Sequence, residues 1–566
     1  MSRINTSTKL IKLKKLLPNS KVVVVGGGIS GLTFTYFLSK LRPDIQLTLL
    51  EKEKRFGGYI NSAPVKINGI SAIFEKGPRT LRGVSSGTLL ITDLLYRTGN
   101  LNQLKGVHLT SNGNKKFLVS SNDLNDLSLV EVPGPGQSFN KMLKFLSSKA
   151  GISAIKGAFK SIFTINGTKN EKKELSVEEF FTRHFGKDLI YNVGSALMYG
   201  VYAADVKDLS ARCVMPSIVE IGDKSDSIAR YAIGSGLKKA FGNAKANDKY
   251  TGNLPPLDED VKLYRDTFET DLQLTKVREI LKRFPMLAFN GGLEKFCQIL
   301  IENMPANVNV ISDDALAKIE KKGDNMIVYS KNGKEFECDH VRSTIGAKSL
   351  GACLQGDSEL RQLLLDYKYT SVSVVNVFIE GDVKNIKGFG FLIPKAHFNK
   401  DNRLIGVIFD SDVESSAKPI FTESILNEVL SNSPCDVEKL KNMALAVHKG
   451  SKDLTPKYTK VTLMINIDPL TQEIPSESKI KMIVKDTFER YLNAPLDNIN
   501  WHMESNHWLQ SIPLYDLKYL ERKDATFKQL KQYDNKLSLG GMSFAHGVGV
   551  PDNVVSSFNA AIELSK

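Results

Sequence analysis

The chain has 566 residues and a formal net charge of +14, with 42% hydrophobic and 24% charged residues. This length exceeds one ordinary hydrophobic core, so two or three globular domains are expected. The five cysteines are scattered without a CxxC spacing, which argues against a zinc site or a disulfide framework. No run of 18 apolar residues predicts a transmembrane helix, and the positive charge favours acidic partners.

The first 20 residues are basic and carry no acidic side chain. Arg3 and four lysines alternate there with leucines and isoleucines, which gives the segment some amphipathic character. This pattern is typical of a mitochondrial targeting segment, and a solvated basic tail is the alternative interpretation.

A glycine-rich loop directly follows the apolar run from Lys21 to Val25, which has the composition of a buried parallel strand. The loop, Gly26 to Gly31, leads into an apolar helical pattern, and a second apolar run (46–50) ends at Glu51. In this order the glycines permit a tight turn and close approach to a pyrophosphate. The helix N-terminus attracts the phosphates, and the acid can accept hydrogen bonds from a ribose. The stretch therefore predicts a dinucleotide-binding unit; an empty glycine turn is the alternative.

The extension of this first unit and four later segments carry a family resemblance. The extension of the first unit, E-x-x-x-R-x-G-G from Glu51 to Gly58, resembles the FAD fingerprint of the amine-oxidase-like flavoproteins. The stretches that narrow the resemblance to the protoporphyrinogen oxidase family are FEKGPRTLR (74–82), GVYAAD (200–205), FNGGLEKF (289–296) and LGGMSFAHGVGVPD (539–552). The resemblance extends over nearly the whole chain from Lys21.

The resemblance implies an α/β fold with three parts. These are an FAD-binding Rossmann-like domain of the GR2 type built from discontinuous segments, a mixed-sheet substrate domain and an α-helical membrane-docking domain. The expected boundaries are a tail at 1–20, the FAD-binding domain at 21–110, 286–345 and 519–566, the substrate domain at 111–134 and 346–518, and the helical domain at 135–285.

The implied cofactor is non-covalent FAD. No cysteine follows Cys435, so a cysteinyl flavin near the C-terminus is excluded. We assign no catalytic side chain and no metal ligand, since the flavin carries the redox step; His546 is the histidine we would test. The residues expected to bind FAD are Gly26, Gly27, Gly28, Ile29, Ser30, Gly31, Glu51, Lys52, Arg55, Gly58, Tyr59, Gly77, Pro78, Arg79, Thr80, Leu316, Met542, Val548, Gly549 and Val550.

The implied substrate is protoporphyrinogen IX, an apolar macrocycle with two propionates. The residues expected to line its slot are Lys116, Phe389, Gly390, Leu392, Ile408 and Met464; ordinary strand core is the alternative for the apolar ones. A bare Gly390 would let a flat ring approach the backbone. Lys116 stands where the family has a propionate-binding arginine, so carboxylate recognition would be less directional. Arg79 and Arg82 are the alternative cations.

A basic amphipathic stretch runs from Val132 to Asn170, which contains six lysines and no acid. Apolar residues recur there every three or four positions, which predicts a helix broken near Gly151. Such a helix can lie on an anionic membrane surface. A nucleic-acid patch would favour arginine, and a solvated helix face is the third interpretation. The family's membrane-docking region supports the lipid interpretation.

The rest of the chain predicts strands and two loops. The expected strands are Val308–Ile311, Met326–Tyr329, Phe336–Val341, 371–379, 388–394, 404–410 and 460–467, and the later ones predict a mixed, largely antiparallel sheet. The range 247–266 is expected to be a loop, and 414–457 an insertion.

The resemblance implies oxidation of CH–CH groups by hydride transfer to flavin. Oxidation of one macrocycle would remove six electrons, consume three O2 and form three H2O2. It also implies a peripheral position on the outer face of the mitochondrial inner membrane and, by analogy, a homodimer and product hand-off to ferrochelatase; no nucleic-acid partner is expected. The alternatives are another flavin amine oxidase, a carotenoid-type desaturase, or a non-enzymatic binding protein like the GDP-dissociation inhibitors.

Overall fold

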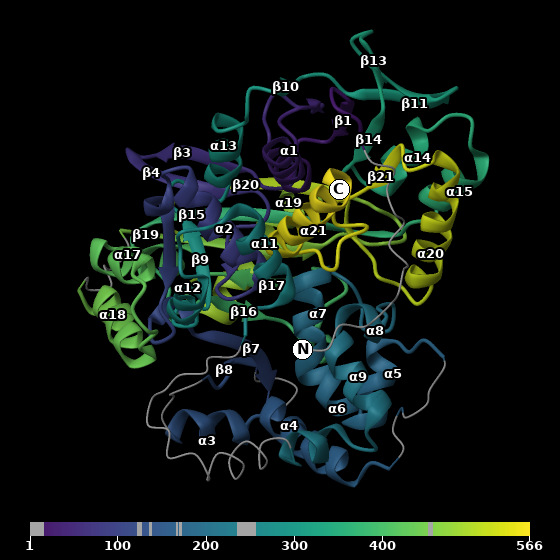
Figure 1. The fold of residues 1–566 in the computed structure, drawn as a ribbon. Coiled ribbons are helices and arrows are strands. Elements are labelled where there is room, and N and C mark those ends of the chain that lie inside the picture. The colour runs from purple at the N-terminus through teal and green to yellow at the C-terminus, as the bar shows by residue number, and fades with distance from the viewer. Residues whose placement is uncertain are drawn as a thin grey trace.

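The computed structural model describes residues 16–121, 127–134, 139–165, 168, 173–234, 256–450 and 457–566. Figure 1 shows their arrangement. Most of the basic tail, Lys169, and parts of the 247–266 and 414–457 ranges lie outside these residues.

A five-stranded parallel sheet with the order β10-β2-β1-β14-β21 contains the glycine-loop strand. Its strands come from three distant parts of the sequence, as a discontinuous domain requires. They are β1 (Lys21–Val25), β2 (Gln46–Leu50), β10 (Val308–Ile311), β14 (His340–Ser343) and β21 (Leu537–Leu539).

Alternate residues of β1 face two different hydrophobic clusters. Val22 and Val24 pack with α1 (Ile29–Leu41) and α21 (Val550–Ser565), which lie side by side in Figure 1. Val23 and Val25 point into the cluster on the other face. Burial on both faces explains the continuous run of β-branched residues.

The single strand predicted at Phe336–Val341 is wrong, because the chain forms two strands there. β13 (Glu335–Cys338) pairs antiparallel with β12 (Asn325–Ser330), and β12 pairs with β11 (Leu316–Lys322). After Asp339 the chain enters β14 and pairs parallel with β1. The Lys21 backbone N–H donates to the Asp339 carboxylate at 2.8 Å, which fixes the change of sheet.

A seven-stranded sheet with the order β20-β15-β19-β17-β16-β7-β8 forms the second layer. Only the β16–β7 pairing is parallel, so the predicted mixed, largely antiparallel sheet is confirmed. Helix α19 (Glu477–Leu492) packs on one face of the sheet. The strands are β7 (Lys116–Ser121), β8 (Leu127–Glu131), β15 (Tyr369–Glu380), β16 (Gly390–Leu392), β17 (Leu404–Ile408), β19 (Tyr458–Asn466) and β20 (Trp501–Pro513).

A helical lobe occupies the lower part of Figure 1. It contains the basic stretch as two helices, α3 (Phe139–Ser147) and α4 (Lys149–Phe163). The predicted break near Gly151 is confirmed and falls at Ser148, whose hydroxyl accepts the Gly151 N–H and caps α4. The other helices are α5 (Val177–His184), α6 (Lys187–Leu189), α7 (Ser195–Tyr202), α8 (Ala211–Val214) and α9 (Pro216–Lys224).

The predicted loop at 247–266 is wrong over its last eight residues. They belong to α11 (Glu259–Phe268), which two acidic residues in its first turn favour. The 414–457 segment carries two further helices, α17 (Glu423–Leu430) and α18 (Val437–Lys449). Lys276 of α12 (Leu274–Leu281) is buried and donates to the carbonyl of Glu428 on α17.

The remaining elements frame these layers. They are β3 (Ser62–Ile67), β4 (Ile70–Glu75), β5 (Leu81–Arg82), α2 (Ser86–Arg97), β6 (Leu104–Val107), β9 (Met286–Phe289), α13 (Glu294–Glu302), α14 (Ala347–Cys353), α15 (Ser358–Leu365), α16 (Asp410–Ser416), β18 (Ala417–Pro419) and α20 (Tyr519–Gln529). Across the described ranges, no helix has both the length and the apolar composition to cross a bilayer.

Candidate cofactor and substrate site

Three of the four glycines of the loop meet different surroundings. Gly26 has a φ of +105°, which favours glycine. A Cβ on Gly31 would lie 1.8 Å from the Gly26 carbonyl oxygen, so Gly31 is required by the packing of α1. A Cβ on Gly28 would meet only the Gly58 Cα, at 3.8 Å. The protein itself therefore does not require glycine at position 28, and the space above it suits a ligand's phosphate.

Glu51 lies beside this loop, with 6% of its surface exposed. Its carboxylate accepts the backbone N–H of Gly27 at 2.6 Å and that of Glu53 at 2.9 Å. A carboxylate offers about four acceptor positions, so two remain for ribose hydroxyls. Lys52 is exposed and pairs with Glu53 at 3.4 Å.

The Gly57–Gly58 turn lies against the first loop. The Gly57 N–H donates to the Gly27 carbonyl at 2.8 Å, and a Cβ on Gly58 would come within 3.2 Å of the Gly28 Cα. Arg55 donates to the carbonyls of Gly58 (2.6 Å) and Ile60 (2.9 Å). The predicted cofactor residue Arg55 thus shapes the turn through its guanidinium.

The N-termini of α1 and α21 come together at the loop. Ser30 of α1 donates to the Asn553 side chain at 2.8 Å, and Ser557 donates to the Ser30 carbonyl at 3.0 Å. The residues before both helices, Gly28 and Gly549, cap them without a side-chain hydrogen bond. The N–H groups of α1, whose first turn carries no acid, are therefore available to an anion, whereas Asp552 lies in the first turn of α21. The predicted residues Ile29, Val548 and Val550 lie in the same two segments.

The segment from Phe74 to Arg82 leads from the end of β4 to β5. A Cβ on Gly77 would lie 2.0 Å from the Tyr59 carbonyl oxygen, so these two backbones are in close contact. Trp508 of β20 donates to the Lys76 carbonyl at 2.5 Å, and its ring meets the Tyr59 ring edge-on at 5.1 Å. The predicted residues Pro78 and Thr80 follow on the same segment.

Glu75 begins this segment as a buried acid. It accepts hydrogen bonds from the Ser62 hydroxyl (2.7 Å) and the Leu293 N–H (2.8 Å). Burial outweighs these bonds and raises the pKa of Glu75 from 4.5 to about 7.

Glu75→Gln is expected to remove a pH dependence of stability. Between pH 4.5 and 7 the folded protein holds a proton on Glu75 that the unfolded chain has released, so this residue's contribution to stability falls as the pH rises. From pH 5 to pH 8 the variant should therefore gain about 2 to 3 kcal/mol relative to the wild type, measured by urea unfolding. A stability difference that does not change with pH would contradict this.

Arg79 and Asp410 form a buried ion pair at 3.0 Å, with 9% and 6% of their side-chain surfaces exposed. The second Asp410 oxygen accepts the Thr462 hydroxyl at 2.7 Å, and the Asn376 side-chain oxygen shares the same hydroxyl hydrogen at a longer distance of 3.0 Å. The Asn376 amide donates to the Glu75 carbonyl at 3.1 Å, so the polar chain runs from Arg79 through the seven-stranded sheet and back to the same 74–82 segment. Arg79, an alternative cation for the propionates, is thus already paired; Arg82 is exposed on β5.

The strand register brings five of the six predicted slot residues together. Lys116 lies opposite Gly390, which lies opposite Ile408. Two residues along, Leu392 and Met464 lie opposite Gly406. Residues in these rows share one sheet face, the one turned away from α19. The sixth residue, Phe389, precedes β16 and packs on a small cluster that includes Val107 and Met286.

Gly390 is expected to be a glycine so that a flat ring can approach the backbone, but its own backbone conformation already requires glycine. Its φ is +143°, and a Cβ would lie 2.1 Å from the Val407 carbonyl oxygen. The backbone conformation and the neighbouring strand therefore exclude a side chain there, whatever the substrate. On the next row, Leu392 lies against Gly200 of α7, where a Cβ would come within 2.9 Å of the leucine.

The two returning cofactor segments follow β10 and β21, at the same end of the parallel sheet as the glycine loop that follows β1. Leu316 begins β11 and is 9% exposed. Met542 is half-buried, and its carbonyl accepts the Tyr515 hydroxyl at 3.0 Å. Sequence reasoning missed the aromatic partners here, Tyr515 and also Tyr369, whose hydroxyl contacts Ser543 at 2.9 Å. It also missed Asp410, although a carboxylate at the end of a predicted strand was a usable signal.

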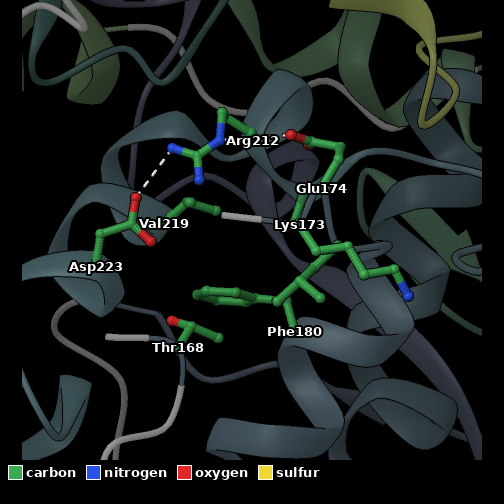
Figure 2. Close-up of a pocket in the computed structure, with 9 residues that line it drawn as sticks. Thr168, Lys173, Glu174, Phe180, Arg212, Val219 and Asp223 are labelled. Atoms are coloured by element: carbon green, nitrogen blue, oxygen red, sulfur yellow. Dashed lines mark hydrogen bonds and ion pairs between the residues drawn. The ribbon is translucent and has the colours of Figure 1, made fainter. Parts of the chain in front are cut away.

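A separate small cavity lies in the helical lobe (Figure 2). Arg212 on one wall pairs with Asp223 at 2.9 Å and with Glu174 at 3.5 Å. Thr168 and Phe180 line the opposite side. Its volume of about 10 Å³ suits one water molecule, so it is no cofactor site. In the described ranges, no cluster of three metal-ligating side chains occurs.

Comparison with known proteins adds three findings. Residues 24–94 match the family model of the NAD(P)-binding Rossmann-like domain. Protoporphyrinogen oxidase of Saccharomyces cerevisiae is 34% identical over 582 residues, covering 98% of this chain and 100% of the yeast protein. That of Bos taurus is 25% identical, covering 95% and 97%. A solved Exiguobacterium sp. 255-15 structure, described as a candidate protoporphyrinogen oxidase, shares the fold with a TM-score of 0.66 and 17% identity, covering 97% of this chain and 100% of that one.

Proposed function

This chain belongs to the protoporphyrinogen oxidase family, and from that membership we propose that its flavin is a non-covalently held FAD that oxygen reoxidises. The protein is a flavin-dependent oxidoreductase that oxidises protoporphyrinogen in haem biosynthesis. The observation that carries the FAD proposal is the open space above Gly28, between two glycine turns and two helix N-termini. A bound FAD would supply the hydride acceptor, in three rounds that consume three O2 and form three H2O2.

The described residues would hold the cofactor at its two ends. The Gly26–Gly31 loop and the α1 N-terminus suit the pyrophosphate, and Glu51 suits a ribose. Backbone amides around Gly77 and Pro78 would face the flavin ring, and the close contact of Gly77 with the Tyr59 backbone holds this segment against the glycine turn.

The substrate would lie against the face of the second sheet that carries Leu392, Ile408 and Met464. These side chains are half-buried, which leaves apolar surface for a macrocycle. Lys116 is exposed at the end of the same row and would supply a positive charge to a propionate. The described site holds no side chain that we assign as an obligate base.

The test of this function is an absorbance spectrum of the purified protein together with a fluorescence assay. A flavin spectrum is expected, with FAD released by denaturation, and porphyrin fluorescence should rise faster than autoxidation when protoporphyrinogen is added. A colourless protein would favour the non-enzymatic alternative. A yellow protein without porphyrin formation, but active on amines or carotenoids, would favour the other flavoenzymes.

We further propose that α3 and α4 bind an anionic membrane surface. The two helices expose six large apolar side chains, and Ile165 just after α4 is a seventh: Met142, Leu143, Ile152, Ile155, Phe159, Phe163 and Ile165. Lys144, Lys149 and Lys156 are exposed between them. Two other lysines have protein partners, since Lys141 pairs with Glu131 at 2.9 Å and Lys160 donates to the Thr182 carbonyl. The combination of apolar and basic side chains suits a lipid interface.

Replacing Lys144 and Lys156 by glutamate should weaken binding to phosphatidylserine-containing vesicles by at least about thirtyfold, because each basic residue near such a surface contributes about 1 kcal/mol. Co-sedimentation measures this. Lys528→Glu with Lys531→Glu is the control, since it makes the same charge change at the exposed end of α20. Equal loss in both variants would contradict a specific docking face.

The basic tail and the family membership support a position on the outer face of the mitochondrial inner membrane. They also support, by analogy only, a homodimer and transfer of product to ferrochelatase. Fractionation of cells that produce the protein with a C-terminal tag tests the location, and recovery in the cytosol would contradict it.

A further inference from the structure

One face of β20 carries three polar or amphipathic side chains in a row: Glu504, Asn506 and Trp508. Strand alternation places them on the same side. Their partners on β15 include Asn376 and Val374, which lie in the rows of the predicted slot. Asn506 therefore shares the sheet face that carries Met464 and Leu392.

The two neighbours of Asn506 both reach Lys76. Glu504 pairs with the Lys76 ammonium at 3.6 Å, and Trp508 donates to the Lys76 carbonyl at 2.5 Å. Gly77 follows directly and touches Tyr59 of the glycine turn. Asn506 thus faces the boundary between the slot sheet and the segment that the flavin ring is expected to approach.

The Asn506 amide nitrogen is buried and has no hydrogen-bond partner among the described residues. Other polar groups nearby on this face are paired: Asn376 donates to the Glu75 carbonyl, and Thr462 donates to Asp410. A buried donor without a partner costs about 1 to 3 kcal/mol, so such a group calls for an explanation. An apolar residue of similar size, such as leucine, would avoid that cost.

We propose that the Asn506 amide donates a hydrogen bond to an acceptor atom of the bound flavin ring. The proposal rests on the proposed FAD cofactor. Asn506 is then a cofactor-binding residue that the family motifs did not indicate. The flavin would also supply the hydrogen-bond partner that the Asn506 amide lacks, whereas its neighbours Glu504 and Trp508 already have partners.

The test is Asn506→Leu, which keeps the volume and removes the donor. Apoprotein titrated with FAD should show a dissociation constant about tenfold higher than that of the wild type, and the flavin absorbance band should shift. The substitution Asn506→Asp keeps the shape even more closely and replaces the donor by a negative charge. It should lower the flavin reduction potential as well as the affinity.

Ser505→Ala is the matched control, because Ser505 is exposed on the opposite side of the same strand. It should leave FAD binding and the spectrum unchanged. If Asn506→Leu raises the melting temperature with FAD affinity and spectrum unchanged, the carboxamide is merely unsatisfied and the proposal is overturned. A variant with a changed KM but unchanged FAD affinity and spectrum would also overturn the proposal, because Asn506 would then contact the substrate and not the flavin. A wild-type protein that binds no FAD would instead overturn the proposed function.

Discussion

Arg79→Met is expected to destabilise the fold by about 3 to 5 kcal/mol, because it leaves the buried Asp410 carboxylate without its ion partner. The remaining bond from Thr462 cannot replace a full positive charge. Urea unfolding at pH 7 measures the loss. Since the same pair joins the 74–82 segment to α16, the variant should also retain less flavin at equal protein concentration.

Arg490→Met is the matched control for this prediction. Arg490 pairs with Asp486 at 3.0 Å on α19, but both side chains are well exposed, so the change should cost at most about 1 kcal/mol. The double variant Arg79→Met with Asp410→Leu should recover most of the lost stability, because apolar residues often replace a buried pair at little cost. Similar losses at Arg79 and Arg490 would contradict the buried pair's role.

Gly28→Ala and Gly31→Ala are expected to separate folding from cofactor binding. Gly28 has ordinary extended angles and open space, so its alanine variant should keep the wild-type melting temperature. The added methyl group would occupy the space proposed for the pyrophosphate and should lower FAD affinity by about a hundredfold. The apoprotein titration with FAD measures this.

The Gly31 variant should lose both properties. Its Cβ would lie 1.8 Å from the Gly26 carbonyl oxygen, so the loop or α1 must move, at a cost of about 1 to 3 kcal/mol or more. A lower melting temperature and weak FAD binding are therefore expected together. If Gly28→Ala binds FAD as the wild type does, the phosphate is not above Gly28 and the cofactor orientation must differ.

The sequence predicted those parts of the fold that depend on neighbouring residues. The run from Lys21 to Glu51 forms strand, glycine loop, helix and strand as expected, because local periodicity and glycine spacing decide them. Local patterns failed where one residue redirects the chain: Asp339 separates two strands that belong to different sheets.

The site was harder to predict because its residues meet through sheet register. Lys116 precedes both Gly390 and Ile408 by more than 270 residues along the chain, and family motifs rather than spacing pointed to all three. No pattern around Asp410 reveals its partner Arg79, 331 residues away. The missing partner of Asn506 is likewise visible only in three dimensions. Pairings of this kind depend on the whole fold.

The contact between α1 and α21 sets an order of events during synthesis. Ser30 and Asn553 are 523 residues apart. The glycine loop therefore cannot contact α21 until the ribosome has synthesised the intervening chain. At about 5 to 20 residues per second, this interval lasts roughly 25 to 100 s. During that time the apolar face of α1, including Phe34 and Phe37, has no α21 to cover it. The nascent chain should therefore depend on chaperones until α21 docks, and it should acquire its cofactor only after that step.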